Sequence, residues 1–141
     1  KEKFDVIICL FSAIGYVKSK AGLQKTVKNM SQHLVPGGVL LIEPWFTPDQ
    51  WNSGKSYILQ VNKPDLKIIR MSYSSKRGNI STLEFQYLIS TPKGLKHDIE
   101  FLELGLFTKA EYLEAFKLAG LKTFHNTKGV DGRGLYIGRK Q

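Results

Sequence analysis

Two runs of apolar residues lie near the start of the chain, and a longer stretch of mixed character separates them. The runs are residues 5–11 and 39–43, and in neither do polar and apolar residues alternate. Such continuous runs are typical of parallel strands, which are covered on both faces of a sheet. The stretch between them has apolar residues at helical spacing, which predicts a helix over residues 21–34. This apolar stripe consists of Leu23, Val27, Met30 and Leu34.

Strand, helix and strand in this order form a βαβ unit, so the pattern predicts an α/β fold with an open parallel sheet. A turn at Pro36-Gly37-Gly38 leads from the helix into the second strand. In open α/β sheets, ligands bind in the crevice beyond the carboxyl ends of the strands. The residues at and just beyond the carboxyl ends of the two predicted strands are therefore candidates for a site: Phe11, Ser12, Tyr16, Glu43 and Trp45.

The period changes to two between Asp65 and Leu104. Apolar and polar residues alternate there in three runs, which are separated by turns at residues 76–79 and 91–94. Alternation of this kind predicts an antiparallel three-stranded meander with one buried and one solvated face. Because it interrupts a parallel α/β pattern, we expect it to be an inserted platform.

The segments on either side of the meander carry helix signals. Thr47, Pro48 and Gln50 predict one or two helical turns, followed by a loop through Lys63. Thr108 and Glu111 form a capping box, which predicts a helix that ends at Gly120. Two short strands, residues 121–125 and 135–138, complete the chain. We therefore divide it into a first core segment with a lid (1–64), the inserted β platform (65–104) and a closing core segment (105–141).

Composition narrows the class of protein. The 141 residues suffice for one domain with a core, and a net charge of +9 favours anionic partners. No apolar run is long enough to span a bilayer and no signal-peptide pattern opens the chain, so we expect no membrane partner. The single cysteine, Cys9, fits a buried thiol in a reducing compartment, which suggests the cytoplasm. The chain starts without methionine and enters a core strand almost at once, so we expect it to be part of a longer protein.

Each candidate residue has a structural explanation as well as a functional one. Glu43 ends a buried strand, so its carboxylate belongs either to a site or to an ion pair with a neighbouring basic residue. Arg133 lies between two glycines, where its guanidinium could meet a phosphate or remain solvated. The three histidines lack metal-ligand spacing, so we expect no metal site. They are His33, His97 and His125.

Six motifs occur in an order that resembles a known enzyme family. They are Phe4–Tyr16, Ile42–Trp45, Ser72–Asn79, Leu106–Phe107, Ala119–Leu121 and Gly132–Gly138. Together they resemble the class I S-adenosylmethionine (SAM) methyltransferases, in particular the dTDP-3-amino-sugar N,N-dimethyltransferases of macrolide biosynthesis. The resemblance implies a Rossmann-like sheet, of which this chain would supply strands 4, 5, 6 and 7, with SAM as cofactor. It also implies transfer of a methyl group to the amine of a small, nucleotide-linked sugar.

The resemblance assigns roles to individual residues. It places the cofactor beside Leu10, Phe11 and Ser12, and the accepting amine near Tyr16, which would be the catalytic residue. The sugar nucleotide would contact Trp45, Arg70, Tyr73 and Arg133, with Arg133 meeting the diphosphate. Glu43 and His97 are further candidates for substrate contact from their own positions, at a strand end and on the meander. The family's glycine-rich loop and its ribose-binding acidic residue have no counterpart here. We therefore expect the chain alone to bind SAM weakly or not at all.

Two other interpretations stay open. The acceptor could be another small amine, a carboxylate or RNA, although the chain lacks the Asp/Asn-Pro-Pro-aromatic signature of enzymes that methylate flipped bases. Alternatively, the chain is a degenerate methyltransferase-like module that docks a partner chain, in a homodimer or a heteromer with residues 5–11 buried between subunits. The sequence leaves open the acceptor, the number of methyl groups transferred and the oligomeric state.

Overall fold

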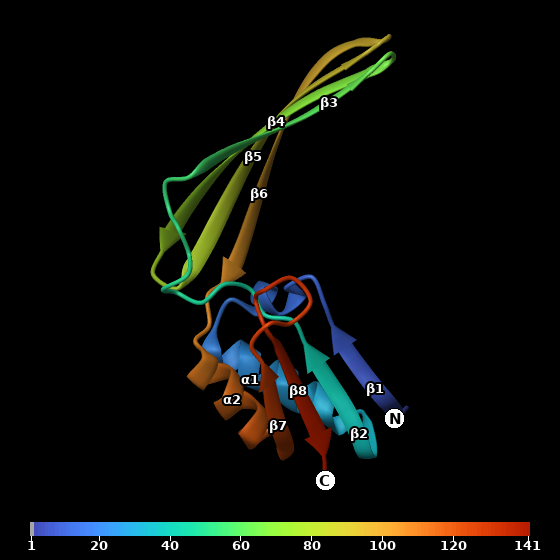
Figure 1. Cartoon of the computed structure of the whole chain (residues 1–141), viewed down its shortest axis with the longest axis vertical. Helices are drawn as coiled ribbons and strands as arrows, with labels where there is room; N and C mark the ends of the chain where they lie inside the picture. The colour runs from blue at the N-terminus through green and yellow to red at the C-terminus, as the bar shows by residue number, and fades with distance from the viewer. Residues whose placement is uncertain (1) are drawn as a thin grey trace. The chain divides into compact units, whose positions relative to one another are not determined.

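The computed structural model describes residues 2–141 and divides them into two compact units (Figure 1). The core unit contains the residues up to Trp51 together with Leu104–Gln141. The inserted unit contains Asn52–Glu103. The expected α/β class with an antiparallel insertion is confirmed.

The core unit is built on a mixed four-stranded sheet in the order β1-β2-β8-β7. Strands β1 (Phe4–Cys9) and β2 (Leu34–Ile42) are parallel, as the βαβ pattern predicts. Strand β8 (Leu135–Lys140) runs antiparallel to β2 and also to β7 (Leu121–Asn126). Between β1 and β2 the chain forms a short 3-10 helix, η1 (Ala13–Val17), and then a regular helix, α1 (Lys20–Gln32).

Helix α1 and helix α2 (Lys109–Leu118) lie on the same face of this sheet, as Figure 1 shows. Both helices begin with a side-chain cap. The Ser19 side chain accepts a hydrogen bond from the Gly22 N–H, and Thr108 and Glu111 form the expected capping box. Side chains from the helices and the sheet form one core, which includes Leu23, Val27, Leu40, Ile42, Tyr112, Phe116 and Tyr136.

The other face of the core sheet carries exposed apolar side chains. Phe4, Val6 and Ile8 of β1 are each about half exposed, although the sequence pattern predicts cover on both faces. Within the described residues, β1 is also an edge strand that pairs with β2 alone. This combination of a bare face and an open edge is the largest departure from the expected parallel sheet.

The inserted unit is a four-stranded sheet in the order β3-β4-β5-β6, so the prediction of three strands is wrong by one. The strands are β3 (Ser56–Lys63), β4 (Leu66–Arg77), β5 (Ile80–Thr91) and β6 (Gly94–Gly105). Alternation does not predict strand β3, because Tyr57, Ile58 and Leu59 are consecutive apolar residues.

The alternation predicts one buried and one solvated face, but the apolar row of β4 is not the buried one. Ile69, Met71 and Tyr73 are exposed, whereas Ser72 and Ser74 are buried. Alternation determines which side chains share a face but not which face is covered. On the exposed face, Met71 lies opposite Gln86 and Ile69 opposite Leu88.

Candidate functional site

The sequence-predicted site residues fall into both units. Leu10, Phe11, Ser12, Tyr16, Glu43, Trp45 and Arg133 belong to the core unit, and Arg70, Tyr73 and His97 to the inserted unit. In the core unit, the structure brings Phe11, Glu43, Trp45 and Arg133 into one cluster.

The ends of β1 and β2 are joined by three hydrogen bonds. The Glu43 N–H donates to the Cys9 carbonyl (2.9 Å), and the Phe11 N–H donates to Oε2 of Glu43 (2.5 Å). The Ser12 hydroxyl donates to the Pro44 carbonyl (2.8 Å). These bonds hold two non-glycine residues in the left-handed region, because Phe11 has a φ of 53° and Ser12 a φ of 58°. Such a conformation costs about 1–3 kcal/mol per residue and persists where its surroundings fix it.

The side chains of Phe11 and Ser12 differ in exposure to solvent. The Phe11 ring is 90% exposed beyond the end of β1, so it can contact a ligand. Ser12 is buried and its hydroxyl is already bonded to Pro44. Leu10 is partly buried just before them. Of the three residues predicted to lie beside SAM, Phe11 therefore presents the most surface.

Glu43 and Arg133 form an ion pair in which Nη2 of Arg133 lies 3.3 Å from Oε1 of Glu43. The Glu43 side chain is only 5% exposed and that of Arg133 22%. Arg133 also pairs with Asp131 through the same nitrogen, so Nη1 and Nε lie outside both pairs. The structure thus shows the ion pair that was one of two interpretations of Glu43. Contact of either residue with a ligand stays a prediction.

Aromatic rings fix the guanidinium of Arg133 from another direction. Its central carbon lies 5.3 Å from the centre of the Trp45 ring and 5.6 Å from that of Phe46, within the range of cation–π attraction. Trp45, Phe46 and Trp51 also contact one another, with ring centroids 4.8–5.8 Å apart. Arg133 is therefore held in one orientation by carboxylates and rings together.

A cleft of about 300 Å³ opens beside this cluster in the core unit. Its lining combines the cationic side chains of Lys109 and Arg133 with one carboxylate, Asp49, and with the rings of Trp45, His125 and Tyr136. Aromatic rings beside two cationic groups can accept an anionic ligand that has a planar or ring portion.

His125 and Lys109 also line the cleft, and the sequence analysis did not select either as a candidate site residue. The His125 ring stacks on Tyr136 at 4.4 Å, and its Nδ1 is buried without a hydrogen-bond partner among the described residues. Burial, and secondarily the charge of Lys109, lowers the pKa of His125, while burial raises the pKa of Tyr136 to about 12. The signal that could have found His125 is the register of the closing hairpin, which places it opposite Tyr136.

Tyr16 lies on η1 and is exposed, so its hydroxyl is accessible to a ligand. The predicted residues of the inserted unit do not form one group. Alternation along β4 puts Arg70 and Tyr73 on opposite faces, and the His97 ring bonds to Gln86 (2.7 Å), which shares the face of Tyr73. Arg70 instead lies over the Phe85 ring, with 5.1 Å between its central carbon and the ring centre.

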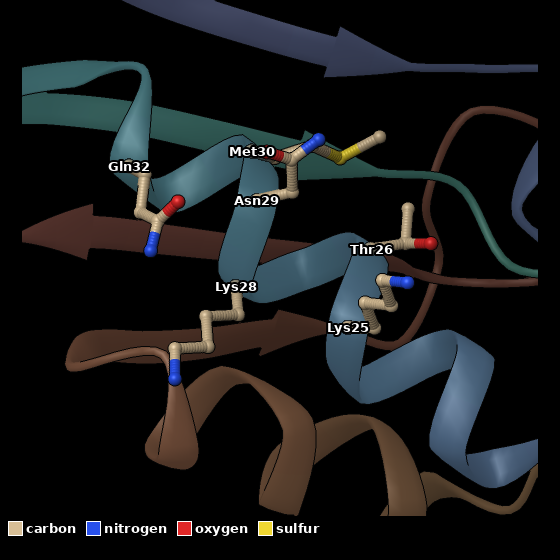
Figure 2. Close-up of a pocket in the computed structure, with 6 residues that line it drawn as sticks. All are labelled: Lys25, Thr26, Lys28, Asn29, Met30 and Gln32. Atoms are coloured by element: carbon tan, nitrogen blue, oxygen red, sulfur yellow. The ribbon is translucent and has the colours of Figure 1, made fainter.

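Other features of the described residues do not indicate a second functional site. A hollow on the surface of α1 is lined only by side chains of that helix, as Figure 2 shows. No group of three or more His, Cys, Asp or Glu side chains between residues 2 and 141 could hold a metal ion. No helix in that range is long and apolar enough to cross a membrane. Burial raises the pKa of Cys9, which keeps its thiol protonated and unreactive.

Comparison with known proteins identifies relatives across nearly the whole chain. It is 34% identical over 137 residues to the dTDP-3-amino-3,4,6-trideoxy-alpha-D-glucopyranose N,N-dimethyltransferase of Streptomyces venezuelae, covering 96% of this chain and 58% of the relative. It is 36% identical over 137 residues to the dTDP-4-amino-2,3,4,6-tetradeoxy-D-glucose N,N-dimethyltransferase of Saccharopolyspora spinosa, covering 97% and 55%. No family model matches the chain.

Among solved structures, too, the chain matches methyltransferases of amino sugars. A SAM-bound amino pentose methyltransferase from Micromonospora echinaspora superposes with a TM-score of 0.91 at 31% identity, over 99% of this chain and 59% of that one. A sugar N-methyltransferase from a Streptoalloteichus species gives 0.93 at 33% identity, over 99% and 57%. The resemblance noted in the sequence is confirmed, and the chain spans little more than half the length of the relatives it matches.

Proposed function

We propose that this chain is the C-terminal portion of a SAM-dependent N-methyltransferase that acts on the amino group of a nucleotide-linked sugar. The observation that carries the proposal is the match, over 99% of the chain, to a methyltransferase of amino pentoses that was solved with bound SAM. The exposed strand-end residues and the basic, aromatic-walled cleft support it, because they offer surfaces for a cofactor and for an anionic sugar nucleotide.

The end of β1 fits one side of the cofactor. Phe11 presents an exposed ring, and hydrogen bonds to Glu43 and Pro44 fix the backbone that carries it. In our proposal Leu10 and Phe11 contact SAM, while Ser12 holds the turn in place. When bound, SAM supplies an electrophilic methyl group on a sulfonium. The glycine-rich loop and the ribose-binding acid are absent from this sequence, so the remaining contacts have to come from additional polypeptide.

The nucleotide sugar would occupy the cleft of the core unit. Arg133 retains N–H groups outside its two ion pairs, and Lys109 lines the same cleft, so both can bind the diphosphate. Trp45 provides an aromatic surface. Arg70, Tyr73 and His97 remain proposed contacts from the inserted unit, although they divide between its two faces.

Catalysis would depend on positioning. Methyl transfer is an in-line displacement, so the site has to align a neutral amine and exclude water. The exposed hydroxyl of Tyr16 can accept a hydrogen bond from the amine and orient its lone pair. We assign it this orienting role, since methyl transfer to a neutral amine needs no strong base.

The bare face and open edge of the core sheet would be covered in the complete enzyme. We propose that the additional polypeptide pairs with β1 and packs on Phe4, Val6 and Ile8, because exposed apolar edge strands otherwise promote aggregation. The cytoplasm is the proposed location, in keeping with one protonated, partly buried thiol.

A direct test is methyl transfer by the complete enzyme, meaning this chain joined to the missing portion. We expect it to bind SAM and to methylate a dTDP-amino sugar, whereas the 141-residue chain should do neither. An Arg133→Lys variant should raise KM for the sugar nucleotide with a smaller change in kcat, because lysine keeps the charge and loses the planar stack. A complete protein that binds no SAM would contradict the proposal, and one that binds SAM without the nucleotide sugar would point to another acceptor.

The bare face also favours a second candidate, a methyltransferase-like module that docks a different protein. In that case the complete protein should bind no SAM, and a separate chain should cover β1. Hydrogen exchange of the β1 amides that do not bond to β2 distinguishes the two, because only the docking module leaves these amides unprotected until its partner is added.

A further inference from the structure

Two carboxylates share one nitrogen of the Arg133 guanidinium. Oε1 of Glu43 lies 3.3 Å from Nη2, and Oδ2 of Asp131 contacts the same Nη2. In an arginine side chain, Nε and Nη2 together form a fork that can donate to two oxygens of a carboxylate or a phosphate. Nε of Arg133 is nevertheless buried and has no hydrogen-bond partner among residues 2–141. One nitrogen of this fork therefore has two anionic partners, and the other has none.

The charges around this fork are not balanced for a further anion. A single guanidinium lies between two carboxylates, so the three side chains together have an excess of negative charge. A phosphate that approached them in this arrangement would be repelled. An anionic ligand of Arg133 can therefore use both Nε and Nη2 only if one of the two carboxylates first moves away.

Glu43 is not the carboxylate that can leave. Its side chain is 5% exposed, and its second oxygen accepts the Phe11 N–H at 2.5 Å. Movement of Glu43 would leave a nearly buried carboxylate unpaired and would release the turn at the end of β1. Both changes are costly, because a charge without its partner is strongly unfavourable in a buried place.

Asp131 is able to move. Its side chain is 39% exposed, so water can solvate the carboxylate once it leaves Nη2. It lies in the loop between β7 and β8, where Gly129, Gly132 and Gly134 have positive φ angles of 59°, 89° and 93°. Its other oxygen, Oδ1, accepts the Arg133 N–H at the long distance of 3.3 Å. The ties of Asp131 are therefore weak, and the glycines allow the loop to change conformation.

We propose that Asp131 is a positioning residue, which holds Arg133 before the substrate binds and exchanges with the diphosphate of the sugar nucleotide. The inference rests on the proposed function, because it takes this diphosphate as the ligand of Arg133. One phosphate oxygen replaces Oδ2 of Asp131 on Nη2, and a second accepts the Nε–H. Arg133 keeps its place during the exchange, since Glu43 and the rings of Trp45 and Phe46 still hold it. When the diphosphate leaves with the product, Asp131 returns to Nη2.

Calorimetric titration of the complete protein with dTDP tests the exchange. Asp131→Asn keeps a side-chain oxygen for the Arg133 N–H but removes the competing charge. We expect it to bind dTDP about fivefold more tightly than the wild type, since a partly exposed ion pair has to be broken only in the wild type. Asp131→Glu keeps the charge and should bind dTDP within about twofold of the wild type. Thymidine, which lacks phosphate, should show no difference between the three proteins.

Glu114→Gln is the matched control for net charge, because it removes a carboxylate of the core unit that lies outside the cleft. It should leave the affinity for dTDP unchanged. Three results would overturn the exchange: unchanged or weaker binding of dTDP to Asp131→Asn, an equal gain for Glu114→Gln or for thymidine, and no binding of dTDP to any of the proteins.

Kinetics separate the exchange from the proposed function. With the amino-sugar nucleotide as substrate, Asp131→Asn should lower KM about fivefold, and its effect should fall on KM rather than on kcat. Methyl transfer with the same KM in the wild type and in Asp131→Asn would overturn the exchange and leave the proposed function standing. Tighter binding of dTDP to Asp131→Asn without methyl transfer to any sugar nucleotide would contradict the proposed function and support the exchange.

Discussion

Glu43 links the two halves of the candidate site. Its carboxylate accepts the Phe11 N–H with one oxygen and pairs with Arg133 through the other. It therefore fixes both the turn that presents Phe11 and the arginine that lines the cleft. A nearly buried carboxylate is stable in that place because both oxygens have partners.

We expect Glu43→Gln to lower the free energy of unfolding by about 2 kcal/mol, since removing one partner of a buried pair is costly but Arg133 keeps Asp131. Urea denaturation of the complete enzyme measures this. The matched control is Glu114→Gln, which breaks the exposed pair with Lys20 and should have a much smaller effect. Equal effects for the two variants would mean that Glu43 does not act through its buried contacts.

His125 predicts a pH dependence. Its pKa is lowered in the folded state, so the unfolded chain takes up a proton first as the pH falls below about 6.5. Stability should therefore decline from that pH down to the folded pKa, and His125→Gln should reduce the decline. Unfolding free energies at pH 7.5 and 5.5 test this. Lys109→Met should slightly reduce the difference in stability between the two pH values, because the charge of Lys109 is the smaller cause of the lowered pKa of His125.

At this scale, sequence reasoning selected candidate residues but did not predict the contacts that the structure shows between them. Glu43 and Arg133 were each candidates for a ligand contact, and the structure pairs them across 90 positions of sequence. His125 was set aside for lack of metal spacing, while its importance comes from stacking on Tyr136. Both facts depend on strand order, which local patterns do not contain.

At the scale of elements, local signals predicted helices well and strands less well. Capping residues and helical spacing lie within a few positions of one another, so α1 and α2 were found close to their observed bounds. Strand β3 and the exposed face of β4 depend on register with distant strands. A strand pattern shows which residues share a face, but not which face is buried.

Helix α2 offers a prediction for its capping box. Thr108→Ala removes the oxygen that accepts the Glu111 N–H, at 3.2 Å, and should lower the free energy of unfolding by about 1 kcal/mol. Thr108→Ser keeps that oxygen and should be close to wild type. Thermal unfolding of the complete enzyme compares the two, and a serine variant as unstable as alanine would argue against the cap.

The contact between β8 and α2 is close enough to exclude a single methyl group. A Cβ at Gly138 would lie 2.6 and 2.7 Å from two ring carbons of Phe116, so Gly138→Ala should destabilise the core unit by about 1–3 kcal/mol. Gly78→Asn serves as control, because Gly78 faces open space and asparagine tolerates its positive φ. Denaturant midpoints that match for the two variants would contradict this packing.

At the scale of the whole molecule, the bare face of the core sheet governs behaviour in solution. We expect the 141-residue chain to bind 8-anilinonaphthalene-1-sulfonate and to aggregate, and the double variant Val6→Lys, Ile8→Lys to reduce both. The same variant should prevent the proposed N-terminal portion from associating when that portion is supplied as a separate chain. Leu118→Lys, at an isolated exposed leucine of α2, should change neither property. Light scattering and dye fluorescence measure these effects.

Strand β8 has an interior place in the core sheet, between β2 and β7, although it is made after both. A ribosome needs roughly 5 to 20 seconds to travel from the end of β2 to the start of β8. Throughout that interval β2 lacks the neighbour that later joins it to β7, and β7 itself is made only shortly before β8. The sheet is therefore completed only after synthesis of residues 135–140. A premature stop codon before them would remove the strand that connects β2 with β7. We expect the truncated protein to be degraded.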